Sequence, residues 1–186
     1  MGEKLSAEAL DTLFMEARTY RTWEDRPVDA KMLEEIWNIA RMGATSTNCS
    51  PARIVFVVSD EAKEKLKECL MDGNVEQTMK APVTAIIGHD MEFYERLPEL
   101  SPHNNARSWF AGNDGLIAET AFRNGTLQGA YLMLAARALG LGKATLGPYQ
   151  NRPSLARRTL EFQRQTICRL VAEQQAPPDG PLTIKE

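Results

Sequence analysis

Apolar residues recur every three to four positions in several stretches of the chain, which is the periodicity of an amphipathic α-helix. The pattern predicts a short helix after Ser6, a second helix that begins near Asp29 and ends at Gly43, and a long helix over 116–139 that is closed by Gly140-Leu-Gly142. The apolar stripe of the long helix is wide, so this helix is expected to be central, either in the core or at a subunit interface.

Two short runs of mainly β-branched and aromatic residues, 54–58 and 81–87, predict strands that are covered on both faces. Between them the pattern predicts a helix over 60–70 that is capped by Asp60, and a short polar helix that ends at Lys80. Strands therefore alternate with helices. This alternation indicates an α/β or an α+β protein.

Two stretches show no clean periodicity. Residues 89–115 are rich in aromatic residues, Pro, Asn and Gly, and are expected to form a mobile cover or excursion over a site. Beyond residue 148 a strand-like run, 166–171, precedes a Pro- and Gly-rich end, 176–181, which is expected to be disordered.

Composition limits the class of protein. A chain of 186 residues can bury its own core, and it contains no apolar run long enough to cross a membrane. Its net charge of −3 offers no basic surface for nucleic acid or anionic lipid. The first residues lack the pattern of a secretory signal, and three widely spaced cysteines suit a reducing compartment, so a cytoplasmic protein is expected.

Common catalytic signatures are missing from the sequence. The two histidines, His89 and His103, stand in no metal-binding spacing and are interpreted as ordinary loop residues, so no metal is expected. Cys49 has no histidine near it in sequence and is interpreted as a small packed thiol rather than a nucleophile.

Two polar segments are candidates for binding a small molecule. The arginines and hydroxyls of 18–23 suit a phosphate group, although residue chemistry alone favours a solvated turn whose charges pair with neighbouring acidic residues. The hydroxyls and the amide of 44–51 suit the edge of a heteroaromatic ring, although residue chemistry alone favours turn and cap residues.

In this order, the two segments resemble motifs of the FMN-dependent nitroreductase family. Residues 18–23 are similar to its Arg-Ser-x-Arg-x-(Phe/Trp) motif, with Thr19 for Ser, and residues 44–51 to its Pro-Ser-x-x-Asn-x-Gln-Pro motif, with Ser50 for Gln. Segments within 45–56, 93–98 and 106–110 are most similar to the malonic semialdehyde reductase branch, the 3-hydroxypropionate dehydrogenase-like proteins of pyrimidine degradation.

The resemblance covers residues 8–148 and implies an α+β, three-layer fold with a central, mainly antiparallel sheet flanked by helices. It further implies a homodimer with FMN at the interface, to which the long helix would contribute much of the contact. The chain then divides into an FMN-binding domain, 1–148, and a divergent, partly disordered C-terminal segment, 149–186, which has no counterpart of the family's later strand and phosphate-binding turn.

The resemblance also assigns binding residues. Arg18, Thr19 and Arg21 would hold the FMN phosphate and ribityl chain, and a second group would approach the flavin from the partner subunit: Thr45, Ser46, Asn48 and Ser50. Asn74 and Gln77 would contact the ring or the ribityl chain. The expected substrate residues are Phe93, Tyr94, Arg107, Trp109 and Phe110. Arg107 is a candidate for binding a substrate carboxylate, and the alternative is a surface salt bridge.

The implied activity is that of an FMN-dependent NAD(P)H oxidoreductase. NADH or NADPH would pass a hydride to flavin N5, and a small aldehyde such as malonic semialdehyde would then accept it, giving 3-hydroxypropionate in a ping-pong reaction. No catalytic side chain is expected, because the flavin carries the hydride. The alternatives are a broad nitro or quinone reductase, and a flavin-fold dimer without turnover because its C-terminal FMN contacts are missing.

Overall fold

The computed structural model describes residues 2–20, 22–24, 26–141 and 182–185. These residues form two compact units: the first holds 2–20, 31–53 and 87–141, and the second holds 22–24, 26–30, 54–86 and 182–185. None of the helices within these ranges combines the length and apolar character needed to cross a lipid bilayer. The strand-like run 166–171 and the predicted disorder at 176–181 lie outside the described residues.

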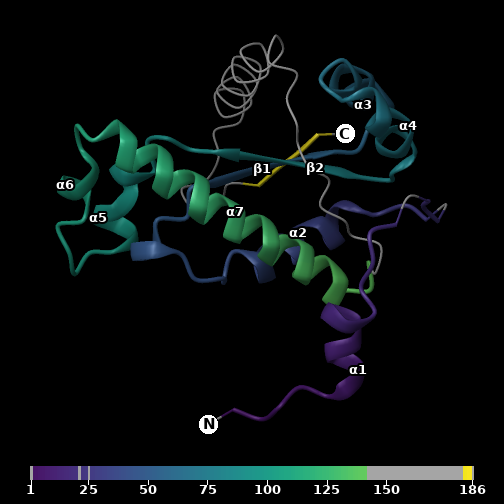
Figure 1. Cartoon of the computed structure of the whole chain (residues 1–186), viewed down its shortest axis with the longest axis horizontal. Helices are drawn as coiled ribbons and strands as arrows, with labels where there is room; N and C mark the ends of the chain where they lie inside the picture. Colours follow the sequence, from purple (N-terminus) through teal and green to yellow (C-terminus); the bar gives the residue numbers. More distant parts are fainter. Residues whose placement is uncertain (1, 21, 25, 142–181, 186) are drawn as a thin grey trace. The chain divides into compact units, whose positions relative to one another are not determined.

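The helices and strands follow one another along the chain as drawn in Figure 1. The elements are α1 (Ala7–Leu10), the π-helical turn η1 (Asp11–Met15), α2 (Ala30–Ala40), the 3-10 turn η2 (Ser46–Asn48), β1 (Ala52–Val57), α3 (Asp60–Lys67), α4 (Asp72–Lys80), β2 (Thr84–His89), the 3-10 turn η3 (Phe93–Arg96), α5 (Leu97–Leu100), α6 (Arg107–Phe110), α7 (Asp114–Ala138) and β3 (Leu182–Lys185).

Strand β1 is central in the described sheet, whose order is β2-β1-β3. It pairs with β3 in parallel, and Ile54 lies opposite Leu182. The backbone N–H of Asp90 donates to the carbonyl of Pro51 at 2.8 Å. This bond connects the end of β2 to the start of β1, so these two strands run antiparallel. The α+β class is confirmed, and β3 is a strand that the sequence pattern did not predict.

Side-chain caps set the starts of two helices. The Ser6 hydroxyl accepts a hydrogen bond from the N–H of Ala9 at 3.2 Å and so caps α1. The cap of α3 is Ser59, whose hydroxyl accepts from the N–H of Ala62 at 3.3 Å. The prediction that Asp60 caps this helix is therefore wrong: Asp60 is its first residue, where a carboxylate favours the positive end of the helix dipole.

The prediction for residues 89–115 also needs correction. This segment contains η3, α5 and α6, which the pattern did not predict, and these turns contribute residues to a buried apolar cluster. The cluster comprises Cys49, Phe93, Leu97, Ala106, Phe110, Ile117 and Ala121. The rings of Phe93 and Phe110 meet edge to face with their centroids 5.0 Å apart. The aromatic residues of the segment therefore serve in part as core of the first unit.

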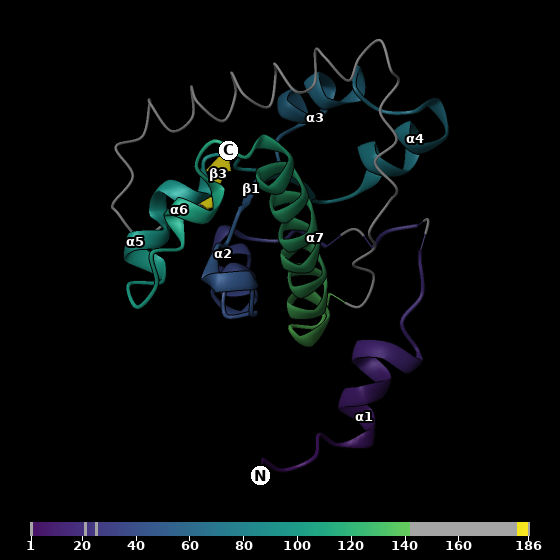
Figure 2. The same cartoon turned by 60° about the vertical axis from the view of Figure 1, so that its left-hand side comes forward.

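The long helix α7 runs beside α2 within the first unit (Figures 1 and 2). The Asn113 side chain caps its start by accepting from the N–H of Leu116 at 3.1 Å. At its end Gly140 has a left-handed φ of +84°, and the N–H of Leu141 donates to the carbonyl of Ala136 at 2.9 Å. This Schellman arrangement explains why the helix stops at the glycine that the sequence pattern indicated.

Two glycines of α7 lie directly against side chains from the end of β2. A Cβ atom on Gly125 would lie 2.4 Å from Cδ2 of His89, and one on Gly129 would lie 2.9 Å from Cδ1 of Ile87. His89 is thus the last residue of a strand, and its interpretation as a loop residue is wrong. Its ring also meets Phe122 edge to face at 5.9 Å.

We expect Gly125→Ala to lower the free energy of unfolding by about 2 kcal/mol, because the added methyl group overlaps the His89 ring. The matched control is Gly115→Ala in the first turn of the same helix, where a Cβ atom meets only Asn113 Oδ1 at 3.8 Å. Alanine should leave stability unchanged or raise it there. Urea unfolding of both variants checks the prediction, and equal stabilities would contradict it.

Burial lowers the pKa of His89. The folded chain therefore favours the neutral ring, whereas the unfolded chain takes up a proton near pH 6.5. The resulting stabilisation is complete above about pH 6.5 and is lost as the pH falls toward the lowered value. We expect His89→Gln to lack this component of the pH dependence between pH 7 and pH 5. The exposed His103, replaced in His103→Gln, should leave it intact. Thermal melts across this pH range measure both.

Candidate functional site

The loop between α2 and β1 has an unusual backbone. Three residues other than glycine adopt left-handed conformations: Thr47 has a φ of 50°, Asn48 of 55° and Ser50 of 37°. This region is unfavourable for side chains, above all for a β-branched residue such as threonine. Such conformations persist only where surrounding contacts hold them, and they cluster at binding sites.

Hydrogen bonds from α7 hold both ends of this loop. Oδ1 of Asn124 accepts from the N–H of Ser46, and Oε1 of Gln128 accepts from the N–H of Ala52, both at 2.8 Å. Within the loop, the Thr45 hydroxyl accepts from the N–H of Ser50 at 3.1 Å. The buried amides therefore satisfy backbone donors that a left-handed loop cannot pair by itself.

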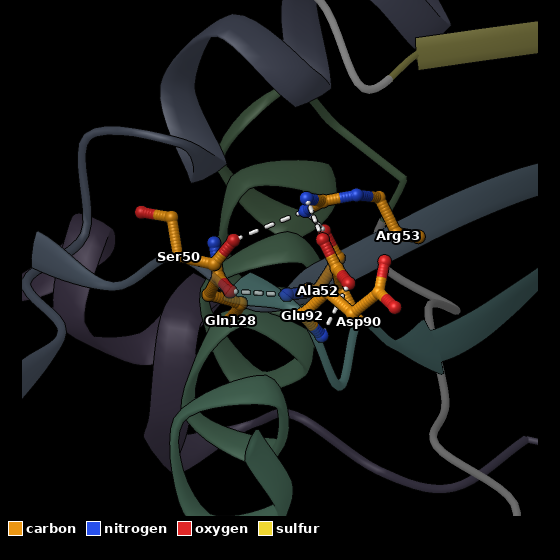
Figure 3. A network of polar contacts seen from close by, with 6 residues as sticks. All are labelled: Ser50, Ala52, Arg53, Asp90, Glu92 and Gln128. Carbon is orange, nitrogen blue, oxygen red and sulfur yellow. Dashed lines mark hydrogen bonds and ion pairs between the residues drawn. The ribbon is translucent and has the colours of Figure 1, made fainter. Parts of the chain in front are cut away.

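A salt bridge supports the C-terminal end of the loop (Figure 3). The Arg53 guanidinium pairs with the Asp90 carboxylate and donates to the carbonyls of Ser50 at 3.1 Å and Ala52 at 2.9 Å. Burial lowers the pKa of Arg53, and the charge of Asp90 opposes this shift. Asp90 Oδ1 also accepts from the N–H of Glu92 at 2.8 Å, so the pair connects β1 with the turn after β2.

The four predicted flavin residues of this loop thus lie together in the first unit. Ser46 and Asn48 are exposed, whereas Thr45 and Ser50 are half-buried. The Asn48 side chain donates from Nδ2 to the Leu100 carbonyl at 2.9 Å. The Ser50 hydroxyl points away from the Arg53–Asp90 pair (Figure 3). Between the left-handed residues, Cys49 is only 1% exposed, which confirms its interpretation as a packed thiol.

Arg18 and Thr19 are exposed in the first unit. The Arg18 guanidinium donates to the carbonyls of Met15 and Ala17, both at 2.9 Å, at the end of η1. Arg21 lies outside the described residues. In the second unit Asn74 and Gln77 are half-buried on α4, and Nε1 of Trp23 donates to the Gln77 carbonyl at 2.8 Å.

The predicted substrate residues have different environments. Phe93 and Phe110 are 1% and 5% exposed, so they contribute to the core rather than to an accessible surface. Tyr94 packs against that core, and Trp109 is 52% exposed. Arg107 forms a two-bond salt bridge with Glu95, at 2.7 and 2.8 Å. This is the surface salt bridge that the sequence left open as an alternative, and it lowers the pKa of Glu95.

A family model described as the nitroreductase family matches residues 15–168. The chain belongs to the nitroreductase family. A Burkholderia lata protein, named as a candidate NADH dehydrogenase/NAD(P)H nitroreductase, is 61% identical over 137 residues, which are 74% of this chain and 70% of the relative. A protein of the same description from Polynucleobacter asymbioticus is 55% identical over 141 residues, covering 76% and 72%.

Solved structures share the fold of this nitroreductase-family chain. A nitroreductase family protein from Streptococcus pneumoniae aligns with a TM-score of 0.64 at 20% identity and covers 83% of this chain and 81% of its own. A candidate nitroreductase from Exiguobacterium sibiricum, solved in complex with FMN, aligns with a TM-score of 0.64 at 16% identity and covers 74% and 73%. The family model and the two relatives confirm the resemblance to the nitroreductase family, and these structures show that its fold is shared.

Sequence reasoning missed the residues that support the loop in this nitroreductase-family chain: Arg53, Asp90, Asn124 and Gln128. A usable signal is present only for the last two. They are uncharged amides four residues apart within a helix whose other inward positions are apolar or small, and they are 5% and 3% exposed. Buried amides are retained where they have hydrogen-bond partners, so this spacing points to a pair of backbone contacts.

We expect Thr47→Gly to raise the free energy of unfolding by about 1 kcal/mol, because glycine adopts a positive φ without steric cost. Thr126→Gly is the control, since Thr126 lies within α7, outside the left-handed region, and glycine there should lower stability. Urea unfolding without added ligand measures both variants. A destabilised Thr47→Gly protein would show that the loop is not strained at this position.

Proposed function

We propose that this nitroreductase-family chain is an FMN-dependent oxidoreductase that uses NADH or NADPH. The family match, the names of the two relatives and the FMN complex of a structural neighbour support this function. The observation that carries the proposal is the loop 44–51, because a strained polar loop held by buried hydrogen bonds occurs at the motif that resembles the family's flavin-binding segment.

The residues of the first unit fit the chemistry of FMN. The loop presents the exposed polar side chains of Ser46 and Asn48 and no charged group, which suits the donors and acceptors on the edge of a flavin ring. The Arg18 guanidinium is exposed and bonded to two neutral carbonyls, so a phosphate is a stronger acceptor for it. Thr19 beside it adds a hydroxyl. We assign Arg21 to the same phosphate and ribityl group from the motif.

In the second unit, Asn74 and Gln77 are the residues that we assign to the flavin ring or ribityl chain. The bond from Trp23 to the Gln77 carbonyl joins α4 to the last residue of the 18–23 motif and so fixes this part of the helix. When bound, FMN supplies a centre that accepts and donates hydride. The side chains of this chain would bind and orient it, and none is assigned a covalent or proton-transfer step.

For the substrate we propose a small aldehyde such as malonic semialdehyde, reduced to 3-hydroxypropionate. The similarity of 93–98 and 106–110 to the corresponding reductase branch supports this choice, as does the exposure of Arg107 and Trp109. To bind a substrate carboxylate, Arg107 would exchange its present partner Glu95. A broad nitro or quinone reductase is the second candidate, because both named relatives are described as candidate NAD(P)H nitroreductases.

We also propose a cytoplasmic homodimer with FMN at its interface. Large apolar side chains are exposed on α7 and in the turn that follows α2. Phe122 is 63% exposed on the helix, and Met42 is 77% exposed in the turn. Between α2, α7 and η1 lies an open groove of about 240 Å³, lined by Leu13, Ile39, Ala40, Gly43, Tyr131, Leu134, Ala135 and Ala138. Exposed apolar surface of this kind is typical of an interface.

We further propose that the chain consists of an FMN-binding domain, 1–148, and a divergent C-terminal segment, 149–186. The alternative to the active enzyme is a flavin-fold dimer without turnover.

The test begins with the visible spectrum of the purified chain in the presence of FMN, followed by anaerobic NADH or NADPH. We expect a bound flavin that is bleached by the nucleotide. Arg18→Ala should raise the dissociation constant of FMN by about 10- to 100-fold, since one hydrogen bond to a charged group is lost. Arg123→Ala is the control, because Arg123 is an exposed arginine of α7 that pairs with Glu119.

Three outcomes of this experiment separate the candidates. Reoxidation of the reduced flavin by malonic semialdehyde supports the aldehyde reductase, whereas reoxidation only by nitroaromatic compounds or quinones supports the second candidate. A bound flavin that neither nucleotide reduces supports the dimer without turnover. Absence of flavin binding at high FMN concentration would overturn the proposed function.

A further inference from the structure

One turn of α7 accepts hydrogen bonds from both ends of the loop 44–51, at Ser46 and at Ala52, the first residue of β1. Asn124 and Gln128 are four residues apart, so their side chains leave the same face of the helix about 6 Å apart along its axis. Their oxygens accept from the N–H groups of Ser46 and Ala52, which are 78 and 76 residues away in sequence. The spacing of the two loop ends is therefore set by a rigid helical turn.

The orientation of the first amide is fixed by a second hydrogen bond. Nδ2 of Asn124 donates to the carbonyl of Thr120 in the preceding turn of α7, at 2.9 Å. Its oxygen is thereby directed at the backbone N–H of Ser46. Both contacts come from uncharged side chains, so they place no negative charge behind the loop. A carboxyl group substituted at either position would favour its neutral, protonated form because of burial, so it would keep an acceptor without adding a charge.

Each amide is followed directly by a glycine, and the two glycines allow side chains from the end of β2 to approach α7 beside the amides. Gly125 lies against His89 and Gly129 against Ile87, and no larger residue fits without displacing them. The sequence 124–129 thus repeats an amide and a glycine, one for the loop and one for the strand. Through the backbone bond from Asp90 to Pro51, the end of that strand also meets the end of the loop.

We propose that Asn124 and Gln128 are positioning residues that hold the left-handed loop in its FMN-binding conformation. This inference rests on the proposed function. Neither residue is assigned a contact with the ligand, because each acts through a backbone N–H at one end of the loop. Without these acceptors the N–H groups of Ser46 and Ala52 would seek water, and Thr47, Asn48 and Ser50 would relax from their positive φ values.

The test uses the full chain with paired substitutions at each position. Gln128→Met keeps the length of the side chain and removes the acceptor, whereas Gln128→Glu keeps an oxygen at the same place. Asn124→Leu and Asn124→Asp form the corresponding pair at the other end of the loop. Thr126→Val is the matched control, because its hydroxyl donates only to Phe122 of the same helix and faces solvent.

We expect Gln128→Met and Asn124→Leu each to raise the dissociation constant of FMN about tenfold, as each removes the acceptor that holds one backbone N–H of the loop. Amide hydrogen exchange at Ser46 and Ala52 should accelerate by a similar factor in the absence of FMN. Gln128→Glu should stay within about threefold of the wild-type value, and Thr126→Val should equal it. Flavin fluorescence measures the binding.

Outcomes that contradict the inference differ from those that contradict the function. If the wild-type chain binds FMN and the acceptor-free variants bind it equally well, the inference is overturned and the function stands. If the wild-type chain binds no FMN, the function is overturned together with the flavin part of the inference, while exchange at Ser46 and Ala52 still reports whether the amides hold the loop. If Gln128→Glu and Asn124→Asp bind FMN as weakly as the acceptor-free variants, packing rather than the hydrogen bonds explains the effect. This outcome also overturns the inference.

Discussion

The candidate site depends on two hydrogen bonds that the amide side chains of Asn124 and Gln128 on α7 accept from the loop 44–51 and the start of β1. A left-handed loop has backbone donors that no regular element can pair, and Asn124 and Gln128 accept two of them at 2.8 Å. Ala52 is 0% exposed, so loss of the Gln128 contact would leave an unpaired donor in the interior, whereas the N–H of the exposed Ser46 would turn to water. The position of the loop therefore follows from the position of one helical turn.

The loop is also anchored from the core side. Cys49 belongs to the same buried cluster as Phe93 and Phe110, so the segment after β2 and the loop before β1 share one apolar core. Burial raises the pKa of the Cys49 thiol, which keeps the group neutral and suited to packing. Thus Phe93 and Phe110, which sequence reasoning assigned to a substrate seat, support the loop 44–51 through this core.

Two ion pairs of the first unit differ in their exposure to solvent. The Arg53–Asp90 pair is mostly shielded from solvent and is joined to the Ser50 carbonyl, so it couples the loop to the end of β2. By contrast, the pair of Arg107 and Glu95 is exposed and contributes little to stability. A weak pair of this kind leaves Arg107 able to exchange Glu95 for a substrate carboxylate, as the aldehyde reductase proposal requires.

The sequence by itself determined the order of the main helices and strands from 30 to 89, the long helix over 116–139 with the glycine that ends it, and the motif that reveals the family. These features depend on neighbours within a few positions, and local periodicity records them. Only the tertiary structure decided that Ser59 caps α3, that 89–115 encloses core, and that Asn124 and Gln128 hold the loop. The hydrogen bonds of Asn124 and Gln128 join residues more than 70 positions apart. Such pairings arise from packing, which a local pattern does not encode.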